Sequence, residues 1–396
     1  MTGAEMASTN PIGVVLTGGD FMALGVLRTL ASKKIPILLL EHEHSISRYS
    51  IYPKRVVKSP SPADPEAYAH FLVSVARKEG VTGWVVFPNS DEIVYALSRY
   101  RDLLAPHFRL PTPCWEIIQN VHIKRNTYQL ATKLGIPIPA THYPASLEEA
   151  ASLDIPFPAV IKPSIRDHYY SRVKTKAYRV NSREELIRVY RQVSEVIPPS
   201  EILVQDLIPG GPRALYSYCP FFKDGHAVAD ITARRARQHP MDFGHASTFA
   251  EVVDIPELKG LAERFLGAID YYGLAEVEFM RDPRDGVYRM IEVNPRVWGW
   301  HALAIAAGVD LPHYLFQDMI GETPRVREAA ANVKWFHLTT DLPTVALEIL
   351  RGRMSLGSYL ASLKGTRKDA VFSMQDPLPF LAELIMIPYL WMKRGF

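Results

Sequence analysis

The first third of the chain alternates short apolar runs with helix-like stretches, and this alternation restricts the fold more than any other feature. Residues 12–16 and 37–40 are apolar runs of strand length, and residues 21–33 between them have helical periodicity. A second unit places the apolar run 84–87 before a helix-like stretch over 93–104. Such order predicts a parallel sheet with helices on its faces.

The middle of the chain is richer in strands, which indicates a second architecture. Pro106, Pro111 and Pro113 mark a boundary, and a helix is predicted around 123–134, before Gly135. Further strands are predicted at 159–162, 177–180, 202–207, 214–222 and 227–233, a helix at 182–194, and a hairpin from 275–280 and 288–293. We therefore expect an α/β unit followed by an α+β unit.

The composition is that of an ordinary soluble protein. The 396 residues carry a net charge of +3, too small for a general nucleic-acid or membrane binder. Cys114 and Cys219 lie far apart and form no CxxC motif. The first ten residues do not resemble a signal peptide, and no uncharged apolar stretch reaches the roughly 18 residues of a spanning helix. We expect a cytoplasmic enzyme that binds no nucleic acid.

The predicted hairpin carries the most informative polar residues. Side chains alternate along a strand, so Glu292 and Asn294 share one face, and the hairpin can bring Glu278 across from them. Two carboxylates and an amide oxygen suit Mg²⁺, which prefers oxygen ligands. Arg296, two residues further on, is placed to bind phosphate groups. Each residue alone would more often be an ordinary surface or paired side chain, but the set predicts a metal site.

Several cations could hold phosphate or carboxylate groups. Lys162 ends an apolar strand, where a lysine is costly unless it meets an anion. Lys124 begins the predicted helix before Gly135, and Arg235 and Arg237 follow a strand and share a face by alternation. The alternatives are a snorkelling Lys162, a solvated helix face at Lys124 and a solvated charged edge strand.

An apolar strand that closes into a turn offers a candidate adenine site. Gln205, Asp206, Leu207 and Ile208 lie just before Pro209-Gly210. Backbone groups of such a segment can bind the edge of a base while apolar side chains cover its ring. Many buried strands also end in Pro-Gly, so this segment indicates a nucleotide site only in combination with the other candidate residues.

Taken in order, these residues resemble the ATP-grasp superfamily. The resemblance rests on Lys124, Lys162-Pro163, the segment 205–210, Glu278 and Glu292-Val293-Asn294-Pro295-Arg296, and covers roughly residues 10–325. It implies a Rossmann-like domain over 1–115 and a two-subdomain ATP-grasp domain over 116–325, with a lid subdomain at about 140–208. A helical C-terminal extension over 326–396 would follow.

The resemblance also implies roles for the candidate residues. Lys124 and Lys162 would contact the phosphates of ATP, residues 205–208 would line the adenine, and Glu278, Glu292 and Asn294 would hold Mg²⁺, with Mn²⁺ as an alternative. Many members have a glycine-rich loop over the phosphates, but residues 164–176 contain no glycine. Arg172, Lys174 or Lys176 would then supply charge from this lid. Pro212-Arg213 stand where many relatives have an acidic residue near the ribose.

The implied activity is an ADP-forming ligase that activates a carboxylate as an acyl phosphate and joins it to an amine. Arg296 and Arg235 would be the catalytic residues, and both substrates would be small molecules. Residues 87–92 and the arginine-rich strand resemble the amino-acid ligase branch, such as D-aspartate ligase-like enzymes. One alternative is a non-catalytic nucleotide-binding protein on the same fold. The other is a nucleotide-dependent oxidoreductase, suggested by Thr17-Gly18-Gly19-Asp20, which is not GxGxxG.

The apolar tail over 377–396 allows two interpretations. We expect it to close over the protein's own core, and docking on a membrane surface or a partner is the less favoured alternative. The sequence leaves open a homodimer, and it does not identify the carboxylate or the amine.

Overall fold

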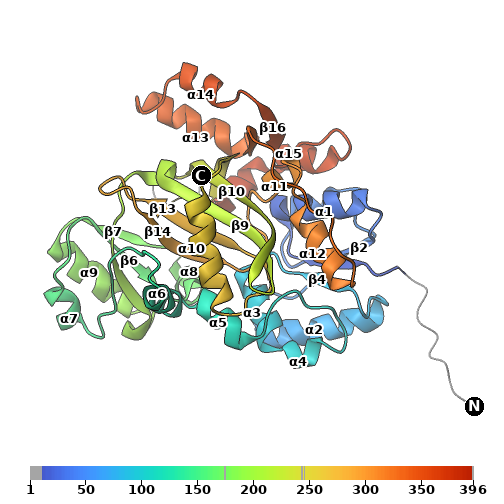
Figure 1. Cartoon of the computed structure of the whole chain (residues 1–396), viewed down its shortest axis with the longest axis horizontal. Coiled ribbons are helices and arrows are strands. Elements are labelled where there is room, and N and C mark those ends of the chain that lie inside the picture. Colours follow the sequence, from blue (N-terminus) through green and yellow to red (C-terminus); the bar gives the residue numbers. More distant parts are fainter. Residues whose placement is uncertain (1–10, 174, 242–243, 245, 395–396) are drawn as a thin grey trace, which may run out of the picture.

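The computed structural model describes residues 11–173, 175–241, 244 and 246–394. Within these residues the strands form three sheets, which follow one another along the chain (Figure 1). The first belongs to residues 14–87, the second to residues 141–206 and the third to residues 215–369. No helix in this described part is both long and apolar enough to cross a bilayer.

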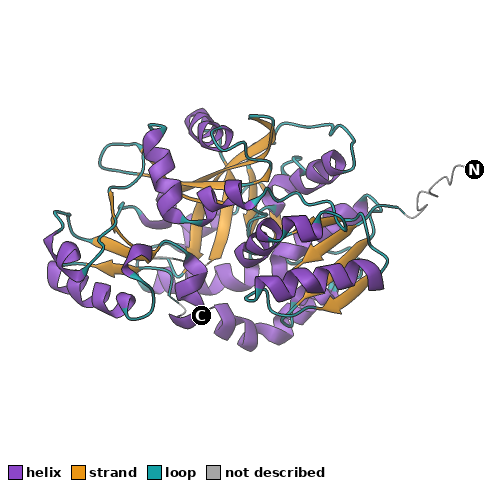
Figure 2. Ribbon diagram, turned by 90° about the horizontal axis from the view of Figure 1, so that it is seen from below, coloured by secondary structure: helices purple, strands orange, loops and turns teal. Residues whose placement is uncertain are grey.

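The N-terminal sheet is parallel, as the alternation predicts. Its order is β3-β2-β1-β4, with Val15 of β1 beside Leu38 of β2 and Val86 of β4. Helices lie on both sides of it (Figure 2). The elements are β1 (Val14–Thr17), α1 (Asp20–Ser32), β2 (Ile37–Glu41), β3 (Arg55–Lys58), α2 (Pro65–Lys78), β4 (Val85–Phe87), α3 (Asp91–Arg99) and α4 (Arg101–Leu104). The single helix predicted over 93–104 is therefore divided at Tyr100.

The second sheet is small and antiparallel, in the order β5-β8-β6-β7. Its elements are β5 (Thr141–His142), α7 (Leu147–Ser152), β6 (Ala159–Pro163), α8 (Arg166–Val173), β7 (Tyr178–Val180), α9 (Arg183–Ser194) and β8 (Ile202–Asp206). The hydroxyl of Ser182 accepts a hydrogen bond from the amide of Glu185 and so caps α9. Leu186 and Val189 of α9 are buried, which fixes the helix on the sheet.

The third sheet is the largest and carries the predicted metal hairpin. Its strands are β9 (Leu215–Lys223), β10 (His226–His239), β11 (Ala246–Val252), β12 (Gly273–Leu274), β13 (Glu276–Arg281), β14 (Tyr288–Asn294), β15 (Val333–Phe336) and β16 (Thr366–Asp369). The helices α5 (Trp115–His122), α6 (Lys124–Lys133) and α10 (Pro256–Gly267) contribute to the core at this sheet. The strand predicted at 227–233 continues to His239, so the arginine cluster lies inside β10 rather than after it.

The C-terminal part combines helices with two strands. Its helices are α11 (Ala302–Ala306), α12 (Leu311–Met319), α13 (Leu338–Leu350), α14 (Leu356–Ser362) and α15 (Leu378–Arg394). We predicted a helical extension, whereas β15 pairs with β11 and with β16 in the large sheet. The physical reason is the alternation of buried and half-buried residues along Val333–Phe336, which suits a strand.

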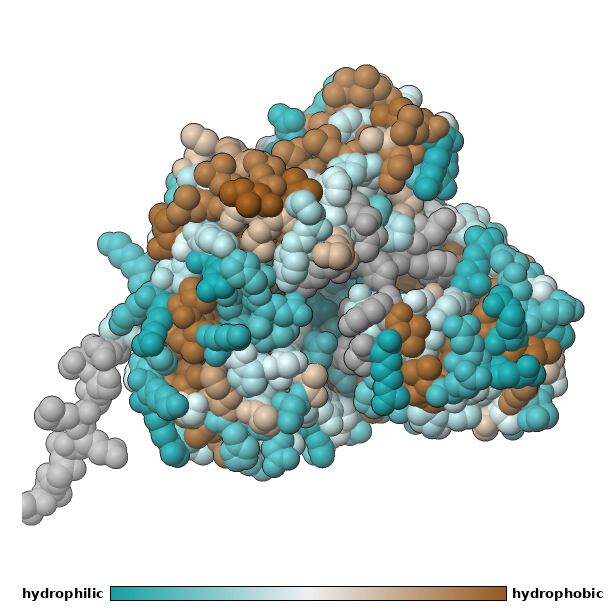
Figure 3. All heavy atoms as spheres, turned by 180° about the vertical axis from the view of Figure 1, so that it is seen from behind, coloured by the Kyte–Doolittle hydropathy of each residue, from teal (hydrophilic) through white to brown (hydrophobic). Residues whose placement is uncertain are grey.

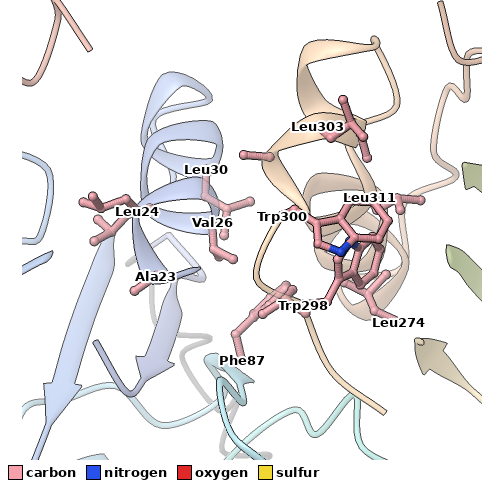
Figure 4. Close-up of a cluster of buried hydrophobic side chains, with 14 of the residues drawn as sticks. Ala23, Leu24, Val26, Leu30, Phe87, Leu274, Trp298, Trp300, Leu303 and Leu311 are labelled. Atoms are coloured by element: carbon pink, nitrogen blue, oxygen red, sulfur yellow. The ribbon is translucent and has the colours of Figure 1, made fainter. Parts of the chain in front are cut away.

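One apolar cluster joins the N-terminal unit to the segment that follows β14. Leu24 and Leu30 of α1 contribute to the same buried cluster as Trp298, Trp300 and Phe87 (Figure 4). Both tryptophans are 1% exposed. Because Trp298 lies two residues beyond Arg296, this packing fixes the path of the chain directly after the predicted metal hairpin.

Candidate active site

A cavity of about 1760 Å³ is lined by residues of the small sheet, of the large sheet and of the loops and helices of the N-terminal unit. The small sheet contributes Lys162 and Gln205, the large sheet contributes Glu278 and Glu292, and the loop after β4 contributes Asn89. Residues far apart in the sequence thus face one space that is large enough for a nucleotide and a second molecule.

The hairpin brings the three predicted metal ligands together. Glu278 of β13 stands opposite Glu292 of β14, two residues before Asn294. The amide nitrogen of Asn294 donates to an oxygen of Glu278 at 3.0 Å. Glu292 also forms an ion pair with Lys124 at the start of α6. The predicted juxtaposition of Glu278 with Glu292 and Asn294 is therefore present.

A fourth acidic residue, Glu276, belongs to this cluster. It is 3% exposed, accepts a hydrogen bond from the hydroxyl of Ser217 at 3.0 Å and another from the amide of Asn294 at 3.1 Å. Burial and the nearby charge of Glu278 raise the pKa of the Glu276 carboxyl well above its ordinary value. Negative charge is therefore crowded at the end of the hairpin.

Two arginines neutralise part of this charge from different elements. The guanidinium of Arg235 on β10 lies 2.7 Å from Glu278 and 3.7 Å from Glu276. Arg296 instead binds Asp91 at the start of α3 through two hydrogen bonds of 2.7 and 2.9 Å. Both arginines line the cavity. Arg296 is thus held by the N-terminal unit while it faces the large sheet.

The arginines of β10 do not share one environment, so our expectation that Arg235 and Arg237 lie on one face is wrong. Arg235 faces the cavity, whereas Arg237 binds Asp341 of α13 at 2.8 and 2.7 Å. The pairing of β10 with β11 shifts register between Arg234 and Arg237. Such an irregularity breaks the simple alternation of side chains along a strand.

Lys162 is buried and lines the cavity. Its ammonium donates to the hydroxyl of Tyr128 at 2.6 Å and lies 5.0 Å from the centre of that ring. The hydroxyl of Tyr128 in turn donates to the carbonyl of Ile291 at 2.6 Å. Burial, with the charge of Lys124 as a second cause, lowers the pKa of Lys162 to about 7. An anion in the cavity would favour its charged form.

The candidate adenine segment also lines the cavity. Gln205 lies on β8 and donates to the hydroxyl of Thr141 at 2.7 Å, while Asp206 pairs with Arg284 at 2.6 Å. Leu207 and Ile208 follow the strand and line the same space. The segment therefore presents backbone and apolar groups to the cavity, while both polar side chains are bound elsewhere.

The predicted lid is partly helical. Residues 166–173 form α8, and Arg172 and Lys176 line the cavity. Lys174 lies outside the described residues. The cations therefore approach the cavity from a short helix and the strand entry after it, and not only from a loop.

Comparison with known proteins agrees with this geometry. Residues 247–323 match the profile of the carbamoyl-phosphate synthase L chain, ATP binding domain. The D-aspartate ligase of Enterococcus faecium (strain Aus0004) is 23% identical over 333 residues, which cover 79% of this chain and 77% of that protein. The carbamoyl phosphate synthase large chain of Methanothermobacter thermautotrophicus is 25% identical over 258 residues, covering 60% of this chain but 23% of that protein.

Solved structures share the fold. The biotin carboxylase domain of the Hydrogenobacter thermophilus 2-oxoglutarate carboxylase, in complex with MgADP, ADP and bicarbonate, has a TM-score of 0.65 at 18% identity, covering 82% of this chain and 74% of that one. An L-amino acid ligase from Bacillus licheniformis has a TM-score of 0.59 at 14% identity, covering 81% and 76%. The chain is an ATP-grasp enzyme. The resemblance predicted from its motifs is thus confirmed.

Sequence reasoning missed three residues of this ATP-grasp enzyme's cavity region. Glu276 lies two positions before Glu278, and strand alternation alone could have placed both on one face. Asp91, which binds Arg296, lies within residues 87–92, a stretch that we used only as a sign of the amino-acid ligase branch. Tyr128, the partner of Lys162, gave no signal, because nothing local distinguishes a helix tyrosine that packs on a distant strand.

The donors at the hairpin fit a divalent cation. Within the described residues, no group of three His, Cys, Asp or Glu side chains is placed to hold a metal. The predicted set instead combines two carboxylates with the amide oxygen of Asn294. Glu278, Glu292 and Asn294 offer only oxygen ligands, which suits Mg²⁺ or Mn²⁺. Burial and the charge of Glu278 raise the pKa of the Glu276 carboxyl, and a bound cation would relieve the repulsion between these two groups.

Proposed function

We propose that this ATP-grasp enzyme is an ADP-forming ligase that couples a small-molecule carboxylate to an amine. The observation that carries the proposal is one cavity lined both by acidic oxygens of a hairpin and by four cationic side chains. These cations are Lys124, Lys162, Arg235 and Arg296. Such an arrangement suits a transferring phosphoryl group. The D-aspartate ligase and L-amino acid ligase relatives support an amino acid or peptide as one substrate.

We assign the nucleotide to the side of the cavity formed by the small sheet. Residues 205–208 would cover the adenine, and Lys162, Lys124 and Lys176 would face the phosphates. Glu278, Glu292 and Asn294 would hold Mg²⁺, which offsets phosphate charge when bound. In this proposal the described part of residues 1–115 forms the Rossmann-like unit, and Asp91 links that unit to Arg296.

The reaction then requires two transfers. A carboxylate oxygen attacks the γ-phosphorus of ATP, the bond to the bridging β–γ oxygen breaks, and ADP leaves. The amine nitrogen next attacks the acyl carbon, phosphate leaves, and the nitrogen loses a proton. Arg296 and Arg235 stabilise the negative charge and orient the carboxylate, so positioning and electrostatics supply the acceleration. No nucleophilic side chain is needed.

The segment 164–176 would exclude water from the acyl phosphate. It lies beside Lys162 and carries Arg172 and Lys176 into the cavity. A reactive intermediate needs such cover, because hydrolysis competes with attack by the amine. We also place the protein in the cytoplasm, consistent with the free thiols of Cys114 and Cys219.

A screen for ADP release tests the proposal. Purified protein with ATP and Mg²⁺ is incubated with a panel of amino acids and dipeptides, and products are identified by mass spectrometry. With the amine withheld and hydroxylamine added, the acyl phosphate should be trapped as a hydroxamate. AMP and pyrophosphate would instead show adenylation. ATP binding without turnover on any carboxylate would favour the non-catalytic alternative.

A further inference from the structure

The C-terminal helix α15 has one buried face and one exposed apolar face. Leu390 is 2% exposed, and Glu383 is 1% exposed and bonded to His337 at 2.7 Å, so one face packs on the protein itself. This confirms the favoured prediction for that face. On the other face Ile385 is 82% and Met392 is 77% exposed. Leu381, Leu384 and Tyr389 extend this apolar stripe at helical spacing.

The exposed apolar surface continues over neighbouring elements. Leu350 at the end of α13 is 83% exposed, and Met374 before α15 is 82% exposed. Leu356 and Leu360 of α14 are also exposed, one turn apart. Figure 3 shows brown surface gathered over the C-terminal helices on the face that it draws. Contiguous apolar surface of this kind marks an interaction site more often than scattered residues do.

The acidic side chains of α13–α15 and of the segments between them point inward. Asp341 and Asp376 are 0% exposed, and Glu348 and Glu383 are also buried. Asp369 accepts hydrogen bonds from the backbone amides of residues 338, 371 and 372. The outer surface of this region therefore presents few negative groups among the described residues.

The exposed charges of the same region are basic. Arg351, Arg353, Lys364 and Arg367 are exposed, and the first two share the buried carboxylate of Glu348. A shallow hollow of about 410 Å³ is lined by Arg367 and Lys368 beside Phe372 and Met374. Cationic and apolar groups thus meet at one edge, where an anionic head group and its acyl chain would both find partners.

We propose that the C-terminal helices dock on an anionic lipid surface, with the stripe of α15 seated at the head-group boundary. The charge pattern decides between this occupant and a second copy of the chain. A two-fold interface built from this region would offer its exposed basic groups few acidic partners, because the acidic side chains of α13–α15 and of the segments between them point inward. A lipid surface instead combines apolar burial with opposite charge. This inference is independent of the proposed reaction.

Vesicle co-sedimentation of the full chain tests the proposal. Vesicles of phosphatidylcholine alone are compared with vesicles that also contain phosphatidylglycerol, at low and high ionic strength. The protein should sediment with the anionic vesicles, and salt should weaken binding. The double variant Ile385→Glu/Met392→Glu should lower partitioning at least about tenfold, whereas Ile385→Leu/Met392→Leu should not. Lys364→Gln/Arg367→Gln should reduce the preference for anionic lipid.

Thermal unfolding followed by circular dichroism shows that each variant is folded, since the altered side chains are exposed. A protein that stays in the supernatant with anionic vesicles at low salt overturns the proposal. So does a dimer, measured by light scattering, that dissociates in the Ile385→Glu/Met392→Glu variant, because the stripe would then be a protein interface.

Discussion

The centre of the cavity is a set of opposite charges whose side chains lie in direct contact. Glu292 pairs with Lys124, and Glu278 pairs with Arg235 at 2.7 Å. Charges removed from water are costly unless each has a partner. These residues satisfy one another, and a phosphate and a cation bound as proposed would exchange those partners. Individual residues therefore have separable effects on binding and on turnover.

The variant Glu292→Gln should reduce ADP formation by about 10²-fold or more and leave the fold intact. It removes a carboxylate from the proposed cation set without changing core volume. Steady-state ADP release measures the loss, and Glu257→Gln on the exposed surface of α10 is the matched control. Activity near that of the unaltered protein would contradict the assignment of Glu292.

Lys162 should make ATP binding depend on pH. Its pKa of about 7 means that the free protein loses this charge as pH rises through 7, so ATP affinity should fall above that pH, by up to about tenfold per unit. Calorimetric titrations between pH 6 and 9 measure the slope. Lys162→Arg should flatten it, because arginine stays charged. Lys162→Ala should weaken ATP binding. An unchanged affinity would mean that Lys162 does not contact the nucleotide and that the alternative of a snorkelling lysine holds.

The same pKa has a consequence for stability. Between about pH 7 and the ordinary lysine pKa of about 10.4 the unfolded chain binds the proton that folded Lys162 has lost. The free energy of unfolding should therefore rise with pH over this window. Chemical denaturation of the protein and of Lys162→Met at pH 7 and 9 checks the sign, and the methionine variant should lack this contribution.

At the scale of elements, the hairpin β13–β14 and the start of α3 form one structural unit. The register of the hairpin places Glu278 beside Glu292, and the two hydrogen bonds from Arg296 tie the end of β14 to Asp91. Ser90 caps α3 through a bond to the amide of Ile93, which fixes where Asp91 lies. Helix α3 of the N-terminal unit thereby positions an arginine that lies two residues beyond the large sheet.

Asp91→Asn should destabilise the protein by about 1.5–3 kcal/mol, because it weakens charged hydrogen bonds to a mostly buried arginine. Denaturant unfolding measures the loss. Glu92→Gln, the next residue of the same helix, should change stability by much less. Equal denaturation midpoints for Asp91→Asn and the unaltered protein would contradict this prediction, because Arg296 would then have found another partner without loss of stability.

At the scale of the whole molecule, the C-terminal region is fastened to the large sheet through Arg237. Its guanidinium lies 4.0 Å from the centre of the Phe249 ring and 5.3 Å from that of Tyr359, and it binds Asp341. The hydroxyl of Thr248 donates to the same carboxylate at 2.8 Å. Helices α13 and α14 are therefore part of the body that carries Arg235.

Arg237→Met should lower the free energy of unfolding by about 3–5 kcal/mol, because it leaves the carboxylate of Asp341 buried without its cation. Arg234 lies on the same strand as Arg237 and forms a half-exposed ion pair with Glu251 of β11. Arg234→Met should lower the free energy of unfolding by no more than about 1 kcal/mol. Hydrogen exchange should show the loss concentrated in α13 and α14. Arg237→Met/Asp341→Leu should recover part of the stability, and the absence of recovery would contradict the pairing argument.

The sequence by itself determined the features that depend on local order. The alternation of apolar runs and helix-like stretches predicted the parallel sheet, and strand alternation with a hairpin placed Glu278, Glu292 and Asn294 together. The motif order around them also predicted the ATP-grasp relationship. These inferences succeed because backbone periodicity is set by neighbouring residues.

Only the tertiary structure decided which partners the charged residues take. The pairing of Arg296 with Asp91 and of Lys162 with Tyr128 joins residues 205 and 34 positions apart. The register shift in β10 sends Arg237 to α13, and β15 enters a sheet that the helical prediction did not include. Such contacts depend on how whole sheets pack, and no local pattern encodes that packing.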